Sequence, residues 1–322
     1  MNDHTLNTVG VDISKVALDV HELPAGRSAQ FANSADGFKQ LADWVAPDTH
    51  CVVYESTGPW HRALEDALAD ELPLSRVNAA RARRFAQAAG ELAKTDAVDA
   101  RVLALMGAAL KLRRVQPPSP EQRDLAELQT ARDALIKDRI TTSNRKHQAR
   151  MPLIKRQIEC RLAQIRRQIR RLDAEIDSLV AASEQLSRQA AILSSIPGIA
   201  RITAAGLISA MPELGRIDAK AAASLAGLAP MTRQSGEWKG RSFIQGGRSK
   251  VRRMLYMSAV TAIQHNPDLA RKYQELRERG KPPKVALTAV MRNLVVLANA
   301  LLKQDRTWSP AAPRPVLAAA GQ

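Results

Sequence analysis

Cysteine and aromatic residues are scarce in this chain of 322 residues, which has two cysteines and 3% Phe, Trp and Tyr. Cys51 and Cys160 have no C-x-x-C spacing and no histidine at ligand spacing, so neither a disulfide framework nor a zinc site is expected. So few aromatic side chains argue against a stacking platform for single strands. We therefore expect contacts to duplexes or to the backbone to dominate any nucleic-acid binding.

The sequence also shows no membrane-spanning or signal segment, and it lacks a phosphate-binding loop for ATP. The chain has no uninterrupted apolar run of about 18 residues and no signal peptide, so we expect no membrane partner. The scarcity of cysteine favours a reducing cytoplasm. The phosphate-binding loop G-x-x-x-x-G-K-[ST] is also missing. Any bond-making step is therefore expected to run without ATP.

Positive charge dominates the composition. Lys and Arg number 48 against 32 Asp and Glu, which gives a net charge of +16 and a pI near 10.4. A field of this sign attracts a polyanion and makes its binding depend on salt. A non-enzymatic nucleic-acid-binding scaffold is one interpretation. It does not explain carboxylates at the ends of apolar strands, because a pure binder gains nothing from acids beside phosphate.

The first third of the chain predicts an α/β domain over residues 1–116. Period-two patterns predict strands at residues 7–14, 15–23 and 29–32, and a 3-and-4 apolar spacing predicts a helix at residues 35–45. A strand at 51–54, a helix opened by Pro59 and a strand at 74–77 follow. Three strands, a helix and a strand are the start of a ribonuclease-H-like order. A further helix is expected to run to about Leu112.

A proline-rich segment at residues 116–120 ends this domain. Residues 117–190 then predict a coiled-coil region, because apolar residues from Met151 to Leu179 are spaced mostly three and four apart. The seam is expected to pair with another helix and to support a dimer or tetramer. Its flanks are basic and suit a phosphate backbone, notably at Arg166, Arg167 and Arg170. A solvated hairpin without nucleic acid is the alternative.

Residues 191–308 predict a mostly helical third domain, followed by a disordered tail at 309–322. The turn at Ile196-Pro197-Gly198 either presents backbone N–H groups to a phosphate, as in a helix-hairpin-helix, or is a tight turn between packed helices. A glycine-rich, basic stretch at residues 232–250 predicts a flexible loop that meets a ligand. Helices are expected at 251–264, 267–279 and 283–303.

Four carboxylates are the main functional signal. Asp12 and Glu55 end apolar strands, and Asp96 and Asp99 form a D-x-x-D pair on one helix face. Clustered carboxylates repel one another and lose hydration, which a divalent cation compensates. Two Mg²⁺ ions held in this way can clamp the attacking and leaving oxygens of a phosphodiester.

Several motifs in order resemble one family, the insertion-sequence transposases of the IS110 ("IS one-ten") type, which are bridge-RNA-guided serine recombinases. The motifs are Gly10-Val11-Asp12, Tyr54-Glu55-Ser56-Thr57-Gly58, the run from Lys94 to Arg101, Ile196-Pro197-Gly198, Gly227-Leu228-Ala229-Pro230 and Ser235-Gly236. The resemblance covers nearly the whole chain. It implies a RuvC-like domain, a coiled-coil middle and a carboxy-terminal transposase domain.

The resemblance also implies the roles of individual residues. Asp12, Glu55, Asp96 and Asp99 would bind Mg²⁺, and Ser235 would be the nucleophile. Ser242 and Ser249 are rival candidates on chemistry alone. Tetramers with active sites shared between protomers, and a noncoding RNA that pairs with donor and target DNA, are further implications. Basic residues expected at nucleic acid near the serine are Arg233, Lys239, Arg241, Arg248 and Lys250.

Two functions compete within the same chemistry. The first is a DNA recombinase that forms a covalent phosphoserine linkage, which conserves the energy of the broken bond. The second is a Mg²⁺-dependent structure-specific endonuclease, of the Holliday-junction type, that uses water as nucleophile. Only the first requires Ser235.

Overall fold

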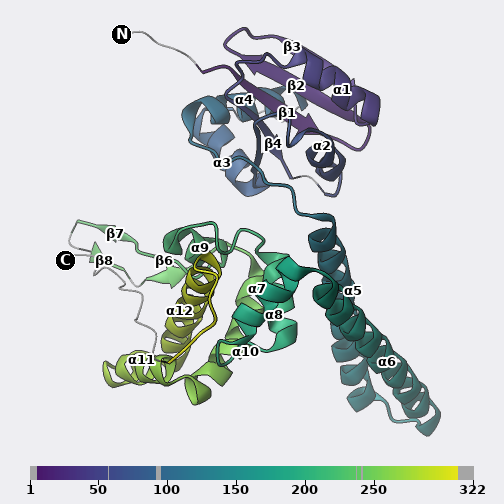
Figure 1. Ribbon diagram of the computed structural model, residues 1–322, viewed down its shortest axis with the longest axis vertical. Helices are drawn as coiled ribbons and strands as arrows, with labels where there is room; N and C mark the ends of the chain where they lie inside the picture. The colour runs from purple at the N-terminus through teal and green to yellow at the C-terminus, as the bar shows by residue number, and fades with distance from the viewer. Residues whose placement is uncertain (1–5, 57, 92–95, 237, 241, 311–322) are drawn as a thin grey trace. The chain divides into compact units, whose positions relative to one another are not determined.

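The computed structural model describes residues 6–310 except 57, 92–95, 237 and 241, and only the backbone of residues 96, 97, 238 and 239. The chain divides into two compact units, Met1–Pro117 and Pro118–Gln322 (Figure 1). The finer division predicted within the second unit stays a prediction. The tail after Pro310 lies outside the described residues.

The first unit is built on a five-stranded sheet. Its strands are β1 (Thr8–Ile13), β2 (Ala17–Leu23), β3 (Ser28–Ala32), β4 (Cys51–Glu55) and β5 (Leu74–Val77). Their order is β3-β2-β1-β4-β5, in which β1 pairs antiparallel with β2 and parallel with β4, and β4 pairs parallel with β5. This mixed α/β arrangement confirms the predicted class and agrees with the ribonuclease-H-like order.

Helices cover both faces of this sheet. The unit contains α1 (Ala35–Trp44), α2 (His61–Leu68), α3 (Ala79–Ala88) and α4 (Asp96–Ala109). Alternate residues of β1 and β4, including Val9, Val11 and Tyr54, join Leu41 and Leu64 of α1 and α2 in one apolar cluster. The intervening residues of β4 pack with α4 in a second cluster. The period-two pattern of the strands therefore gives the sheet two buried faces.

Helix α4 approaches the sheet unusually closely because two glycines lie at the contact. A methyl group on Gly10 of β1 would lie 1.9 Å from the carbonyl oxygen of Ala100. One on Gly107 would lie 2.8 Å from Cys51 Sγ. The Thr8 hydroxyl donates a hydrogen bond of 3.0 Å to the Ala104 carbonyl. The backbone of α4 thus rests directly on β1.

The second unit begins with a long antiparallel helical hairpin of α5 (Pro120–Gln148) and α6 (Pro152–Ala182). The predicted seam is buried in α6 at Leu162, Ile165, Ile169 and Ile176. Its partner is α5 of the same chain, so the seam by itself does not require a second protomer. The first part of the seam, at Met151 and Ile154, is exposed.

Six more helices complete this unit around one large apolar cluster. They are α7 (Glu184–Ser194), α8 (Arg201–Ala210), α9 (Ala219–Leu225), α10 (Ser249–His265), α11 (Pro267–Glu278) and α12 (Pro283–Lys303). The helices predicted in the last third of the chain are confirmed.

Helix α12 qualifies the expectation that no long apolar segment exists. Within the described residues it is the one helix whose length and composition would suit a membrane crossing. Ten of its residues are buried against the other helices of the unit, among them Val290, Leu294 and Leu301. Its apolar character is therefore used in the core of this unit.

The turn at Ile196-Pro197-Gly198 packs against α10. Gly198 has φ +105°, and a methyl group there would lie 2.6 Å from the Ser258 carbonyl oxygen and 2.9 Å from the Ala262 nitrogen. Ile196 and Ile199 are buried beside it. Helix packing accounts for this glycine, which favours the tight-turn interpretation over the phosphate-binding one.

Replacing Gly10 by Ala is expected to lower the free energy of unfolding by about 1–3 kcal/mol, because the new methyl group meets the backbone of α4, which cannot yield without lifting the helix. Urea unfolding of the full-length variant, followed by circular dichroism, measures the loss.

The matched control is Gly107→Ala, whose methyl group meets side-chain atoms of Cys51 and Val53, at 2.8 and 2.9 Å, and no strand backbone. Alanine also gains about 1 kcal/mol of helix propensity there. An equal loss in both variants would show that the backbone contact at Gly10 is not special.

Candidate active site

Asp12 and Glu55 lie on neighbouring parallel strands at one edge of the sheet. The register of β1 and β4 pairs Val11 with Tyr54, so the next residues along the two strands are Asp12 and Glu55. Both are half-buried. Thr8 and Gly10 contact α4, and alternation places Asp12 on that same face. The packing of Cys51 and Val53 against α4 places Glu55 there too.

The first turn of α4 is brought to this edge by the way the helix runs. Thr8 contacts Ala104, and Gly10, two residues along β1, contacts both Ala104 and Ala100. Two strand residues span about 6.7 Å and a helical turn about 5.4 Å. Asp12 is therefore level with the turn that begins at Asp96 and contains Asp99. Asp99 is half-buried, and the side chain of Asp96 lies outside the described residues.

Oxygen ligands of this kind suit Mg²⁺, which prefers carboxylates and water. Within the part of the chain whose side chains are described, however, no three Asp, Glu, His or Cys residues are close enough to hold a metal ion. Asp12 and Glu55 both make interactions with other residues. The fold thus brings Asp12, Glu55 and the first turn of α4 to one edge, and the described side chains do not form a coordination shell.

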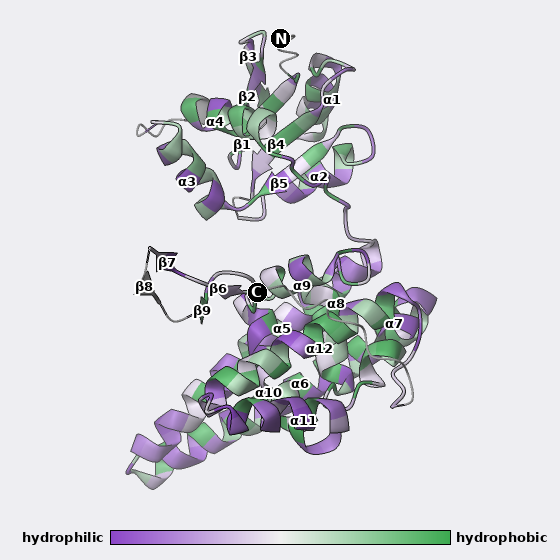
Figure 2. Cartoon of the chain, turned by 90° about the vertical axis from the view of Figure 1, so that its left-hand side faces the viewer, coloured by the Kyte–Doolittle hydropathy of each residue, from purple (hydrophilic) through white to green (hydrophobic). Residues whose placement is uncertain are grey.

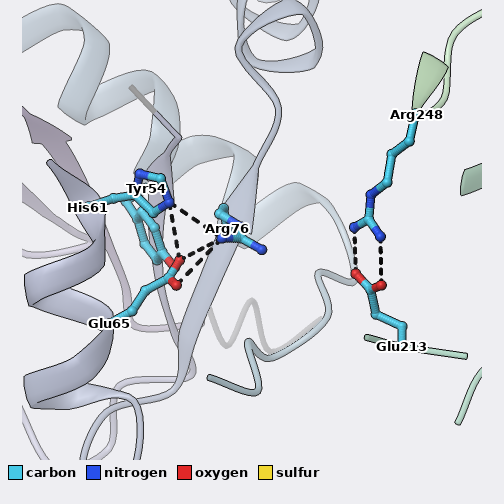
Figure 3. A network of polar contacts seen from close by, with 6 residues as sticks. All are labelled: Tyr54, His61, Glu65, Arg76, Glu213 and Arg248. Carbon is cyan, nitrogen blue, oxygen red and sulfur yellow. Dashed lines mark hydrogen bonds and ion pairs between the residues drawn. The ribbon is translucent and has the colours of Figure 1, made fainter. Parts of the chain in front are cut away.

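A buried polar network lies on the opposite face of the same strands (Figure 3). Tyr54 donates a hydrogen bond to Glu65 of α2, and Arg76 Nη1 of β5 donates one of 3.1 Å to Glu65 Oε1. Arg76 Nη1 also lies 3.4 Å from His61 Nε2. Glu65 is only 4% exposed. The network ties α2 to β4 and β5, and so fixes the strand that presents Glu55.

Burial sets the protonation states in this network. The pKa of His61 is lowered, mainly by desolvation and against the attraction of Glu65, so its ring is neutral near pH 7. Burial and the hydrogen bond to Glu65 raise the pKa of Tyr54. This cluster was not predicted from the sequence. The signal available was the i, i+4 spacing of His61 and Glu65 on the face of α2 that also holds Leu68.

Ser235 lies at the tip of a β-hairpin, whereas a flexible loop was predicted. Strands β7 (Gln234–Ser235) and β8 (Trp238–Lys239) pair antiparallel, and β6 (Pro230–Met231) pairs with β9 (Phe243–Ile244). Ser235 pairs with Trp238 across the turn, and Gly236 has φ +56°. The loop prediction was wrong because the glycine content suits a tight turn as well as a flexible segment. Ser235 is exposed.

The root of this hairpin is held firmly. Gly227 (φ +68°) and Gly247 (φ +65°) touch backbone to backbone, since a methyl group on Gly247 would lie 2.2 Å from the Gly227 nitrogen. Arg252 Nη1 donates a hydrogen bond of 2.7 Å to the Gly246 carbonyl. Figures 1 and 2 show β7 and β8 projecting away from the helices. An anchored root thus presents an exposed tip.

The basic residues that were predicted to contact nucleic acid near Ser235 lie in different environments. Arg233 lies over the Phe243 ring with its Cζ 5.0 Å from the ring centroid. Arg248 forms a bidentate ion pair with Glu213, at 2.6 and 2.7 Å, and Lys250 pairs with Asp133 at 2.9 Å (Figure 3 shows the former). The structure therefore gives Arg248 and Lys250 a role in joining helices. The Lys239 side chain and all of Arg241 lie outside the described residues.

The arginines of α6 have a different setting. Arg166, Arg167 and Arg170 are exposed, with Arg166 on the flank of the buried seam and Arg167 on the opposite side of α6. Among the ion pairs of the described residues, none involves these three, whereas Arg132 and Lys146 of α5 pair with Asp173 and Glu159 of α6. In Figure 2 much of this hairpin is hydrophilic. These arginines remain predicted contacts of nucleic acid.

Known proteins resemble this chain along both units. Residues 9–149 match the DEDD-type IS110 family model, described as a transposase, and residues 190–274 match a model described as the transposase IS116/IS110/IS902 family. The first match contains all four predicted carboxylates and the second contains Ser235.

Individual relatives agree with these matches. The chain is 28% identical to the pilin gene-inverting protein of Moraxella bovis over 93% of this chain and 97% of that protein, and equally to the one of Moraxella lacunata. It is 31% identical over 161 residues to an uncharacterized 43.6 kDa protein of insertion element IS110 of Streptomyces coelicolor, which covers 49% of this chain and 39% of that protein.

The lowered pKa of His61 predicts a loss of stability in acid. As the pH falls through the unfolded value of 6.5 toward the lower folded pKa, the unfolded chain binds the proton first, so stability present above that value is lost. We expect the unfolding midpoint of the wild type to fall more between pH 7.5 and pH 5.5, about one unit either side of the ordinary pKa, than that of His61→Gln.

Thermal unfolding at both pH values measures this difference, with His147→Gln as the control because His147 is exposed on α5. Parallel midpoints for the wild type and His61→Gln would contradict the assignment.

Proposed function

Because this chain belongs to the IS110 family of DNA transposases, we propose that it cuts and rejoins DNA through a serine that attacks phosphorus beside carboxylate-held Mg²⁺. The nucleophile is Ser235. The carboxylates are Asp12, Glu55, Asp96 and Asp99. The observation that carries this proposal is the placement of Asp12 and Glu55 side by side at the edge reached by the first turn of α4.

The carboxylates have the chemistry that Mg²⁺ binding needs. Asp12 and Glu55 are half-buried at the end of neighbouring strands and Asp99 is half-buried in the first turn of α4, and a cation held between them would offset their mutual repulsion. When bound, Mg²⁺ would stabilise the charge that develops on the phosphate oxygens. The RuvC-like character of the domain is part of this proposal.

The serine step follows from the exposed hydroxyl at the hairpin tip. Ser235 Oγ forms a bond to phosphorus and gives up its proton, while the bond from phosphorus to one deoxyribose oxygen breaks and that oxygen becomes a hydroxyl. The phosphoserine retains the energy of the broken bond, so the reverse attack by a new strand reseals DNA without ATP. Arg233, two residues from Ser235, can stabilise the developing negative charge.

The nucleophile and the carboxylates belong to different compact units. We propose that a dimer or tetramer completes each centre, with the serine of one protomer and the carboxylates of another. Donor and target DNA would be selected by pairing with a noncoding bridge RNA. The support is the family resemblance and the exposed arginines of α6 in a chain of net charge +16. Such a protein would act in the cytoplasm, at the nucleoid.

The gene-inverting relatives suggest what the same chemistry can do. Inversion, excision and insertion differ in which ends are joined, and each needs only strand breakage and resealing. We include inversion among the reactions open to this chain.

Ser235→Ala is expected to abolish the covalent protein–DNA linkage and strand exchange, because no other group supplies the attacking oxygen. Denaturing gels of the protein with labelled DNA, bridge RNA and Mg²⁺ detect the linkage. Cleavage that persists in Ser235→Ala would favour the endonuclease that uses water.

The controls are Ser242→Ala and Ser249→Ala, which lie near Ser235 in the sequence and should keep the linkage. Asp12→Ala and Glu55→Ala should lose Mg²⁺-dependent cutting while Ser235 remains. If both carboxylate variants kept every activity of the wild type, the carboxylates would have no catalytic role. That outcome would favour the non-enzymatic nucleic-acid-binding scaffold.

Neutralising Arg166, Arg167 and Arg170 together as Gln is expected to reduce the slope of log affinity for RNA against log salt by about 2–3, because each lost phosphate contact removes nearly one released counterion. Filter binding over a salt series measures the slope.

A triple variant of the same charge change on α11, at Arg271, Lys272 and Arg277, is the matched control. Arg271 and Lys272 are paired with Asp268 and Glu275, and Arg277 bonds the Lys281 carbonyl. Equal reductions in the two variants would show that net charge, and not the α6 surface, governs binding.

A further inference from the structure

Two loops at the carboxylate edge of the first unit carry an unassigned group of side chains. The turn after β1 holds Lys15 and Val16, and the loop after β4 ends at Trp60, which precedes α2. Asn33 joins them, because its Nδ2 donates hydrogen bonds of 2.7 Å to the Ser14 carbonyl and 3.4 Å to the Trp60 carbonyl. These loops directly follow β1, whose last residue but one is Asp12, and β4, which ends at Glu55.

The side chains in this group are exposed and apolar or cationic. Val16 is 73% exposed and Trp60 is 40% exposed. The Lys15 ammonium lies 5.7 Å from the centroid of the Trp60 ring. Ser14 Oγ accepts hydrogen bonds from the Val16 and Ala17 nitrogens, which fixes the turn that presents them. The group is thus an ordered surface.

Core packing does not explain the tryptophan. Of the tryptophans whose side chains are described, Trp44 packs against the first unit's apolar cluster and Trp308 against that of the second, and only Trp60 is exposed. Trp60 joins neither described cluster of its own unit. The indole therefore keeps an exposed part that a ligand can contact.

We propose that Lys15, Val16 and Trp60 form a subsite for the DNA strand being cut, in which the indole stacks on one unpaired nucleobase. The Lys15 ammonium would bind the adjacent phosphate, and Val16 would contact the base or sugar. This inference rests on the proposed function, because it places the substrate strand beside Asp12 and Glu55.

The chemistry of the group favours a nucleic-acid strand over a protein partner. An aromatic ring beside a cation matches a base beside a phosphate, and stacking is worth roughly 1–3 kcal/mol per base. The excess positive charge of the chain draws the same polyanion. One indole is enough for one base, which is compatible with a chain too poor in aromatics for an extended stacking platform.

The test compares full-length variants in the Ser235→Ala background, so that binding is measured without cutting. The probes are a short single-stranded oligodeoxyadenylate and an abasic oligonucleotide of the same length. Trp60→Ala is expected to weaken binding of the first about tenfold and to leave binding of the second unchanged, while Trp60→Phe keeps most of the affinity. Lys15→Gln should weaken both probes alike and reduce the salt slope by about 0.7.

Equal affinities of Trp60→Ala and its parent for the oligodeoxyadenylate would overturn the proposal, as would an equal loss on both probes. A Trp60→Ala variant that changes only the oligomeric state would also overturn it, in favour of an interface between copies. An unchanged unfolding midpoint shows that the variant is folded. Since no probe is cut, failure here is separate from failure of the serine mechanism.

Discussion

The contact between the backbone of α4 and Gly10 of β1 is the constraint on which the candidate site depends. With no side chain at Gly10, the helix lies against the strand, and its direction brings the first turn of α4 to the edge that holds Asp12 and Glu55. A bulkier residue would lift the helix and separate the two sources of carboxylates. The same close approach leaves room for Thr8 to bond the Ala104 carbonyl. Glycine therefore has a geometric role in the chemistry.

Much of the first unit could be predicted because its signals are local. The strands around Val11, Val20 and Val53 alternate or are continuously apolar, and Pro59 comes just before α2. The buried network of Tyr54, Glu65 and Arg76 was not predicted, because it joins three elements that the sequence does not show to be neighbours. The positions of Asp12 and Glu55 at strand ends were visible, and their adjacency required the pairing of β1 with β4.

In the second unit, local sequence patterns did not identify the contact partners of several residues. The seam from Met151 to Leu179 correctly indicated a helical pair, but periodicity alone does not say whether the partner belongs to the same chain. The sequence left phosphate binding and helix packing open for the Gly198 turn, and it predicted a ligand for the stretch around Ser235. The structure buries the Gly198 turn against α10 and leaves the Ser235 hairpin exposed. Arg248 and Lys250 were predicted to contact nucleic acid, and in the structure they form ion pairs with Glu213 and Asp133.

Because Gly227 contacts Gly247 backbone to backbone, the root and the tip of the hairpin differ in their tolerance to substitution. Neither position accepts a side chain without parting the two backbones, whereas a methyl group on Gly236 would meet no atom within 4 Å. Substitution and drift at the tip therefore leave the helical scaffold intact.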